Sequence, residues 1–169
     1  MPGEDRDVVV GLDNGGTAIN ATVLDGAGRF LVDRLVETPS RVGEGPAVAI
    51  EALSDALTAV LKLTGVPREA VQAVGLDTPG PASADGVIST RGAVNFADPA
   101  WRGFDVRGAL EARLGLPVTY NNDANAASLV GRQLSGSLQP QRFDNLIAVK
   151  RRRLACLMRK HRSRQQLDL

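Results

Sequence analysis

The sequence predicts an α/β fold in which a mixed sheet carries helices on both faces. Short β-branched segments near the N-terminus are separated by glycine-rich turns, which favours antiparallel strands. From residue 46 onward, helical and strand patterns alternate, as in sheets whose parallel strands are joined by crossover helices. The 169 residues are 43% apolar and 23% charged, which is ordinary for one globular domain with a real core.

The N-terminal part predicts three strands in an antiparallel meander. Residues 8–12 are short and β-branched, residues 19–24 are apolar, and residues 29–37 alternate between apolar and polar. Residues 25–28, Asp-Gly-Ala-Gly, have the composition of a tight turn. Two hairpins in succession give the meander.

The remaining segments predict helices and strands in alternation. Pro46 opens a helix whose apolar residues repeat at helical spacing as far as Leu61, and Gly65 is a suitable stop. Residues 71–77 form the next predicted strand. The later elements are a helix capped by Asp105 and ended by Gly115, a strand at 117–120, a helix through Ala126, Ala127 and Leu129, and a strand at 145–149.

Three strand ends in this scheme are polar and loop-like. They are residues 13–17, 77–81 and 121–125. Ligands of open α/β sheets bind outside the carboxyl ends of the strands. We therefore expect these three segments to form one site.

The first segment, Asp13-Asn14-Gly15-Gly16-Thr17, has two interpretations. Paired glycines let a backbone approach phosphate closely, and Thr17 adds a hydroxyl donor. Asp13 can hold Mg²⁺ through water. The spacing is not the Walker pattern, which needs a lysine after a longer loop. The alternative is a tight β-turn with local hydrogen bonds from Asp and Asn, and the motif alone leaves both open.

The third segment offers a carboxylate and an amide for sugar chemistry. Asp123 follows a strand and can act as the general base that accepts a proton from an attacking hydroxyl. Asn122 can hydrogen-bond a neighbouring hydroxyl, and Asn95 can serve the same end from another loop. The structural alternatives are helix capping by Asn122 or Asp123 and an ordinary Asx-turn at Asn95.

The composition argues against a membrane-spanning, secreted, disulfide-bonded or zinc-cluster protein. The sequence has no apolar run near the roughly 18 residues of a membrane span, and its polar, acidic N-terminus does not resemble a secretory signal. We expect a cytoplasmic protein with no membrane partner. A single cysteine, Cys156, and a single histidine, His161, exclude an internal disulfide and the common zinc clusters.

Residues 150–169 differ sharply from the rest. They hold eight Lys or Arg against one Asp, a net charge of +7, so the other residues sum to −6 in a chain of net charge +1. A nucleic-acid-binding arm and a solvated terminal helix are two interpretations. We favour a third, a natural sequence interrupted by a frame change or an incomplete gene. This tail is then disordered or non-native, and no nucleic-acid partner is expected.

Several motifs together resemble one family. The segments GLDNGGT, GLDTPGPASADGVI and NFADPAWRGFDVRGALEARLGLPVTYNNDANAA occur in the order and spacing of the ROK family (repressors, open reading frames and kinases). The family comprises bacterial sugar kinases such as glucokinase, and related sugar-responsive repressors. The resemblance covers roughly residues 7–131.

The resemblance implies an actin-like ATPase fold, also called ribonuclease H-like, with two domains around a cleft. Residues 1–149 would be the N-terminal sugar- and phosphate-binding domain, and the C-terminal ATP-binding domain would be absent. By the same resemblance Asp13, Gly15, Gly16 and Thr17 match the phosphate loop. The sugar-side residues would be Gly80 in its loop, the amides Asn95 and Asn122, and the catalytic base Asp123.

The implied activity is transfer of the γ-phosphoryl group of ATP, with Mg²⁺, to a hydroxyl of a hexose, impaired in a truncated chain. Ala18 stands where kinases of the family commonly carry lysine, and Asn121 where many carry glutamate. The second glycine-rich segment and the zinc site of the family do not follow residue 150. The alternatives are a non-catalytic, sugar-responsive regulator and a non-functional fragment. The sugar stays open, and a homodimer is an expectation from the family alone.

Overall fold

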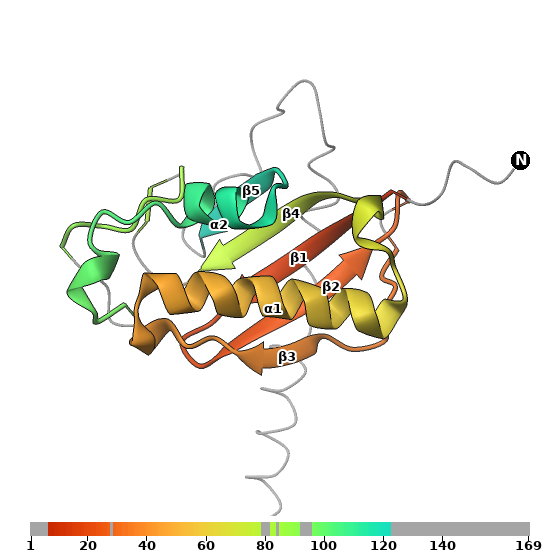
Figure 1. Ribbon diagram of the computed structural model, residues 1–169, viewed down its shortest axis with the longest axis horizontal. Helices are drawn as coiled ribbons and strands as arrows, with labels where there is room; N and C mark the ends of the chain where they lie inside the picture. The colour runs from red at the N-terminus through yellow and green to blue at the C-terminus, as the bar shows by residue number, and fades with distance from the viewer. Residues whose placement is uncertain (1–6, 28, 79–81, 84, 92–95, 123–169) are drawn as a thin grey trace, which may run out of the picture. The chain divides into compact units, whose positions relative to one another are not determined.

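The central element is a five-stranded mixed sheet with strand order β3-β2-β1-β4-β5 (Figure 1). The computed structural model describes residues 7–27, 29–78, 82–83, 85–91 and 96–122. β1 pairs antiparallel with β2, β2 pairs antiparallel with β3, and β4 lies parallel to both β1 and β5. The predicted meander and parallel units are confirmed. The strands are Val8–Asn14, Ala18–Leu24, Val36–Pro39, Val71–Thr78 and Val118–Asn122.

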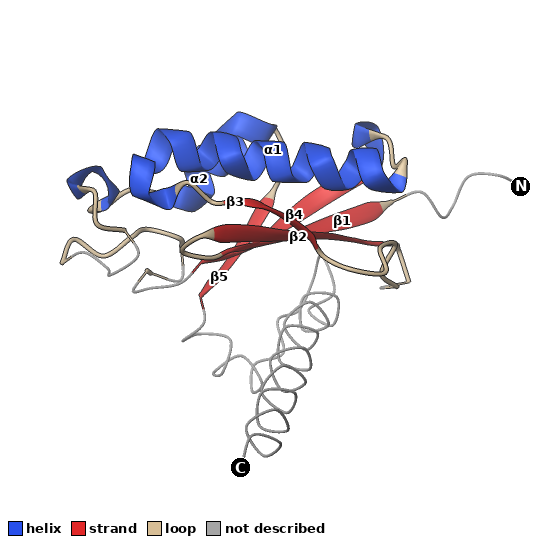
Figure 2. Ribbon diagram, turned by 90° about the horizontal axis from the view of Figure 1, so that it is seen from below, coloured by secondary structure: helices blue, strands red, loops and turns tan. Residues whose placement is uncertain are grey.

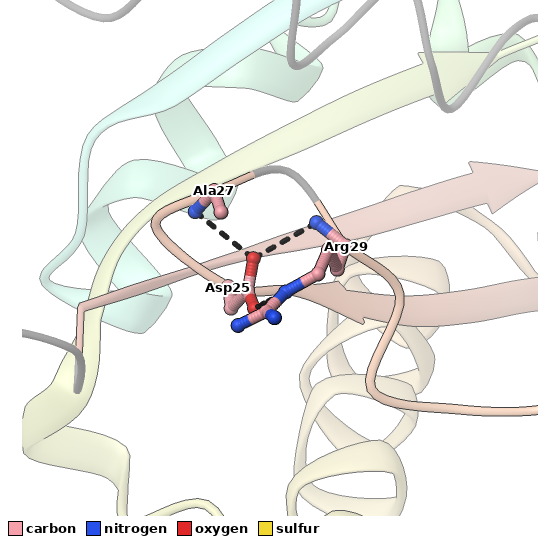
Figure 3. A network of polar contacts seen from close by, with 3 residues as sticks. All are labelled: Asp25, Ala27 and Arg29. Atoms are coloured by element: carbon pink, nitrogen blue, oxygen red, sulfur yellow. Dashed lines mark hydrogen bonds and ion pairs between the residues drawn. The ribbon is translucent and has the colours of Figure 1, made fainter.

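The third strand is shorter and later than the pattern of residues 29–37 predicts. Pairing with β2 resumes directly after the turn at Asp25, where Phe30 bridges to Leu24 and the Leu31 N–H donates to the Val23 carbonyl at 2.9 Å, but it breaks again before β3 begins at Val36. Asp25 itself closes the turn (Figure 3). The Asp25 carboxylate accepts hydrogen bonds from the backbone N–H groups of Ala27, at 2.9 Å, and Arg29, at 2.8 Å. It also pairs with the Arg29 guanidinium at 2.7 Å. These bonds close the turn that leads from β2 to the Phe30 bridge, and the predicted strand is shorter because residues 32–35 leave the ladder.

Helix α1, Pro46–Thr64, has proline at its first turn and ends at Gly65, whose φ is 68°. Helix α2, Val106–Leu114, begins where the Asp105 carboxylate accepts a hydrogen bond from Gly108 N–H at 2.8 Å. Gly115, with φ of 64°, ends it. Three short 3-10 helices complete the described elements: η1 Val42–Glu44, η2 Arg68–Ala70 and η3 Pro99–Trp101. The predicted caps and stops of both helices are confirmed.

Both described helices cover the same face of the sheet (Figure 2). Alternate residues of β1, such as Val10 and Leu12, are fully buried in the core on this side. The predicted helix through Ala126, Ala127 and Leu129 and the predicted strand at 145–149 lie outside the described residues. Among the described helices, none has the length and apolar character needed to cross a membrane.

Candidate functional site

The carboxyl ends of β1, β4 and β5 meet at one edge of the sheet. Asp13 of β1 lies opposite Asp77 of β4, and Asp77 lies opposite Asn121 of β5. Thr78 lies opposite Asn122 in the next row. The turn between β1 and β2 also stands at this edge, because β1 ends at Asn14. The strand ends that were predicted to converge therefore do so for the residues that are described.

The same tetrapeptide occurs in β1 and in β4, the two neighbouring strands at the middle of this edge. Val-Gly-Leu-Asp occurs at residues 10–13 and again at 74–77, and the sheet places each residue opposite its counterpart. The side chains of Asp13 and Asp77 therefore project from the same face of the sheet, on neighbouring strands about 4.8 Å apart. Asp77 is 6% exposed and Asp13 is partly buried. Asp77 begins the predicted segment 77–81, but no individual role was predicted for it, although the repeat is a signal that could have suggested one.

The β1–β2 turn holds its shape through a close backbone approach. The Gly15 N–H donates to the Ala18 carbonyl at 2.8 Å. A Cβ at Gly15 would lie only 2.9 Å from that same oxygen, so a side chain would force the turn open. Gly16 and Thr17 are exposed at the tip. This tight turn presents backbone and a hydroxyl to solvent, as the phosphate interpretation requires.

Two buried polar side chains lie next to this turn. Asn14 is 1% exposed, and within the described part of the chain neither atom of its amide has a hydrogen-bond partner. The hydroxyl of Ser40, which is fully buried, has none there either. The Ser40 N–H donates to the Thr17 carbonyl at 3.1 Å, so the segment after β3 is tied to the turn. Buried polar atoms without a hydrogen-bond partner are uncommon, so these two side chains mark a polar region next to the turn.

The sugar side of the predicted site is described only in part. Thr78 and Tyr120 share a buried hydrogen bond between their hydroxyl groups, which joins β4 to β5. The backbone of Asn122 ends β5 at this edge, directly before Asp123. Gly80, Asn95 and Asp123 lie outside the described residues, so their predicted roles stay predictions.

The segment that follows Asn95 is anchored to the start of α1. Trp101 is 1% exposed, and its indole N–H donates to the Val42 carbonyl at 2.9 Å. Its ring packs against Phe96, with centroids 4.6 Å apart, and against the edge of Phe104 at 5.6 Å. The aromatic cluster fixes residues 96–104 relative to the β3–α1 connection.

The oxygen donors at this edge fit a magnesium ion. Mg²⁺ takes one or two carboxylates and completes its shell with water and substrate phosphate. Asp13 and Asp77 supply two carboxylates on neighbouring strands. Among the described residues, no group of three or more His, Cys, Asp or Glu side chains is assembled for a metal.

The fold and this edge define the class of protein. A mixed sheet of order 3-2-1-4-5, with a glycine-rich hairpin beside a carboxylate at the end of β1, is a domain of the actin-like ATPase, or ribonuclease H-like, type. The chain belongs to the ROK family, whose sequence profile matches residues 9–149.

Individual relatives agree with this assignment. A glucokinase from Streptomyces coelicolor is 37% identical over 122 residues, which cover 72% of this chain and 34% of that protein. A ROK hexokinase structure from Thermus thermophilus is 40% identical with a TM-score of 0.57, covering 77% of this chain and 40% of that one. A ROK family glucokinase from Streptomyces griseus, in complex with glucose and AMPPNP, is 30% identical with a TM-score of 0.54, covering 72% and 35%. The chain thus spans about a third of the length of the curated relatives it matches.

Proposed function

We propose that this chain supplies the sugar- and phosphate-binding part of a cytoplasmic hexose kinase, which transfers the γ-phosphoryl group of ATP to a sugar hydroxyl. The observation that carries the proposal is the register that aligns Asp13, Asp77 and Asn121 at one edge of the sheet. This register brings the glycine-rich turn and the end of β5 to the same edge of the sheet. The likeness to glucokinases, at 37% identity for the relative from S. coelicolor, supports the same activity.

Each predicted residue has a role in this proposal. The backbone of Gly15 and Gly16 and the Thr17 hydroxyl hold phosphoryl oxygens, while Asn95 and Asn122 orient the sugar beside Gly80. Asp123 accepts the proton of the attacking hydroxyl. Asp13 holds Mg²⁺, which supplies charge neutralisation when bound. The protein's own contribution is positioning, which accounts for much of the catalysis in phosphoryl transfer.

The proposed domain comprises residues 1–149. Because the chain spans about a third of the length of the curated relatives it matches, we expect the chain by itself to transfer phosphate slowly. The experiment incubates the chain with Mg·ATP and glucose, fructose, mannose or an N-acetylated hexose, and records ADP release and the melting temperature. We expect one hexose to raise the melting temperature and to increase ADP release.

Asp123→Asn separates catalysis from binding. It should abolish hexose-dependent ADP release and leave the sugar-induced rise in melting temperature, because the amide still hydrogen-bonds but accepts no proton. Asp85→Asn, at an exposed residue outside the site, is the control. Stabilisation by a hexose without any ADP release from the wild-type chain would favour the sugar-responsive regulator. A chain that responds to no hexose would favour the non-functional fragment.

A further inference from the structure

The phosphate-binding edge has an excess of negative charge. Between residues 7 and 28 the sequence contains no Lys or Arg. Asp13 and Asp77 lie side by side, and Glu37 of β3 belongs to the same row through Asn20. A triphosphate brought to this edge meets carboxylates, so its binding calls for cationic groups beyond the hairpin.

Arg41 is the cation that the backbone brings to the turn. β3 ends at Pro39, which lies opposite Ala18, and the Ser40 N–H bonds the Thr17 carbonyl at 3.1 Å. Arg41 is the next residue, and its Cα therefore lies about 3.8 Å from that of Ser40. Both views place the β1–β2 turn, the end of β3 and the start of α1 together at one end of the sheet (Figures 1 and 2).

The backbone of Arg41 is in an unfavourable conformation. With φ of 53° and ψ of 23°, it is left-handed, and among the described residues it is the one non-glycine with positive φ. Glycine would adopt this conformation at no steric cost. A non-glycine residue held there points to a use for its side chain.

The Arg41 guanidinium makes a two-pronged contact with a carboxylate. Its Nε donates to Oε1 of Glu44 at 2.9 Å, and its Nη2 donates to Oε2 at 2.7 Å. The two side chains are 48% and 54% exposed. An exposed pair of this kind contributes little to stability, so exchange of the partner is easy. The same fork geometry binds two phosphoryl oxygens.

We propose that Arg41 is a phosphate-binding residue, which leaves Glu44 to bind the phosphoryl oxygens of a polyphosphate or nucleotide held at the β1–β2 turn. This inference rests on the proposed function and adds the cation that the hairpin lacks. Glu44 holds the guanidinium in place when no phosphate is bound and competes with the ligand for it.

The test is calorimetric titration of the full chain with Mg·tripolyphosphate, which needs no adenosine site. The matched control is Arg113, whose pair with Glu51 has the same two-pronged geometry, at 2.7 and 2.8 Å, and almost equal exposure, 46% and 53%. Arg41→Met should raise the Kd about tenfold, the usual effect of losing a charge-assisted bond. Arg113→Met should leave the Kd unchanged, and Glu44→Gln should lower it.

Arg41→Gly guards against a folding artefact, since glycine fits the left-handed conformation. It should weaken binding as much as Arg41→Met while the circular dichroism spectrum stays that of the wild type. Equal affinity in the wild type, Arg41→Met and Arg113→Met would overturn the inference and leave the proposed function intact. A wild-type chain that binds a hexose but no tripolyphosphate would overturn both the role of Arg41 and that of the hairpin.

Discussion

Trp101→Phe tests whether the segment after Asn95 is held to the start of α1 by one buried hydrogen bond. The indole N–H donates to the Val42 carbonyl at 2.9 Å, and phenylalanine keeps an aromatic ring but has no donor. The carbonyl then retains one weaker partner, the Gly45 N–H at 3.4 Å. The substitution therefore isolates the hydrogen bond with limited loss of packing.

The expected destabilisation follows from these contacts. A buried carbonyl that loses its main partner costs about 1–2 kcal/mol, at the lower part of the usual range because Gly45 remains. The smaller ring loses contacts with Phe96 and Phe104 and leaves a small cavity, which adds about 1 kcal/mol. The free energy of unfolding should fall by about 2–3 kcal/mol, which lowers the urea midpoint by about 1 M.

The assay is urea unfolding followed by far-ultraviolet circular dichroism, because Trp101 is the chain's single tryptophan and the variant loses its fluorescence. Phe104→Leu is the control: this ring is only partly buried and meets Trp101 edge-on at 5.6 Å without a hydrogen bond. Its midpoint should fall by less than half as much. A Trp101→Phe midpoint equal to that of the control would refute the role given to the hydrogen bond.

Three other substitutions probe the turns. Gly15→Ala should destabilise the chain by about 1–3 kcal/mol and abolish tripolyphosphate binding, because its Cβ would lie 2.9 Å from a backbone oxygen. The control Gly43→Ala, whose Cβ would have nothing within 4 Å, should change neither stability nor binding. Asp25→Asn should lower stability at pH 7 by about 1 kcal/mol in urea unfolding. The hydrogen bond from the Arg29 backbone N–H lowers the pKa of Asp25. This stabilisation is therefore present above the ordinary value of 3.8 and is lost as the pH falls below it, so the difference from the wild type should shrink as the pH is lowered through that range. Gly86→Ala should lower the melting temperature strongly, because φ is 88° and the Cβ would meet a neighbouring side chain at 2.7 Å; an unchanged value would contradict that packing.

The sequence predicts the elements whose signals are local. Pro46 and Gly65 bound α1, and Asp105 and Gly115 bound α2, because each cap satisfies backbone groups within a few residues of itself. The strands of the parallel part follow from buried β-branched runs. The glycine-rich turn between β1 and β2 is recognisable for the same reason, since paired glycines and a hydroxyl are neighbours in the chain.

The remaining features depend on contacts between distant residues. The delayed start of β3 reflects a break in its pairing with β2 at residues 32–35, after Phe30 has bridged to Leu24, and the alternation of residues 29–37 does not reveal that break. The sequence places Asp77 in a polar strand end, but the alignment of Asp77 with Asp13 depends on the pairing of β4 with β1, 64 positions earlier in the chain. Arg41 belongs to no sequence motif; the pairing of β3 with β2 brings the preceding residue, Ser40, to Thr17. The periodicity of the sequence does not reveal which residues of two strands lie opposite each other.

The Val-Gly-Leu-Asp tetrapeptide shared by β1 and β4 places different residues on the two faces of the sheet. On the side of α1 and α2, valine and leucine of both copies fill the core. On the opposite side the register places Gly11 beside Gly75, one row behind the carboxylates of Asp13 and Asp77. Two adjacent glycines leave the sheet without side chains there, so a covering element can approach the backbone closely. Both described helices lie on the other face (Figure 2), so the predicted helices on this face stay a prediction.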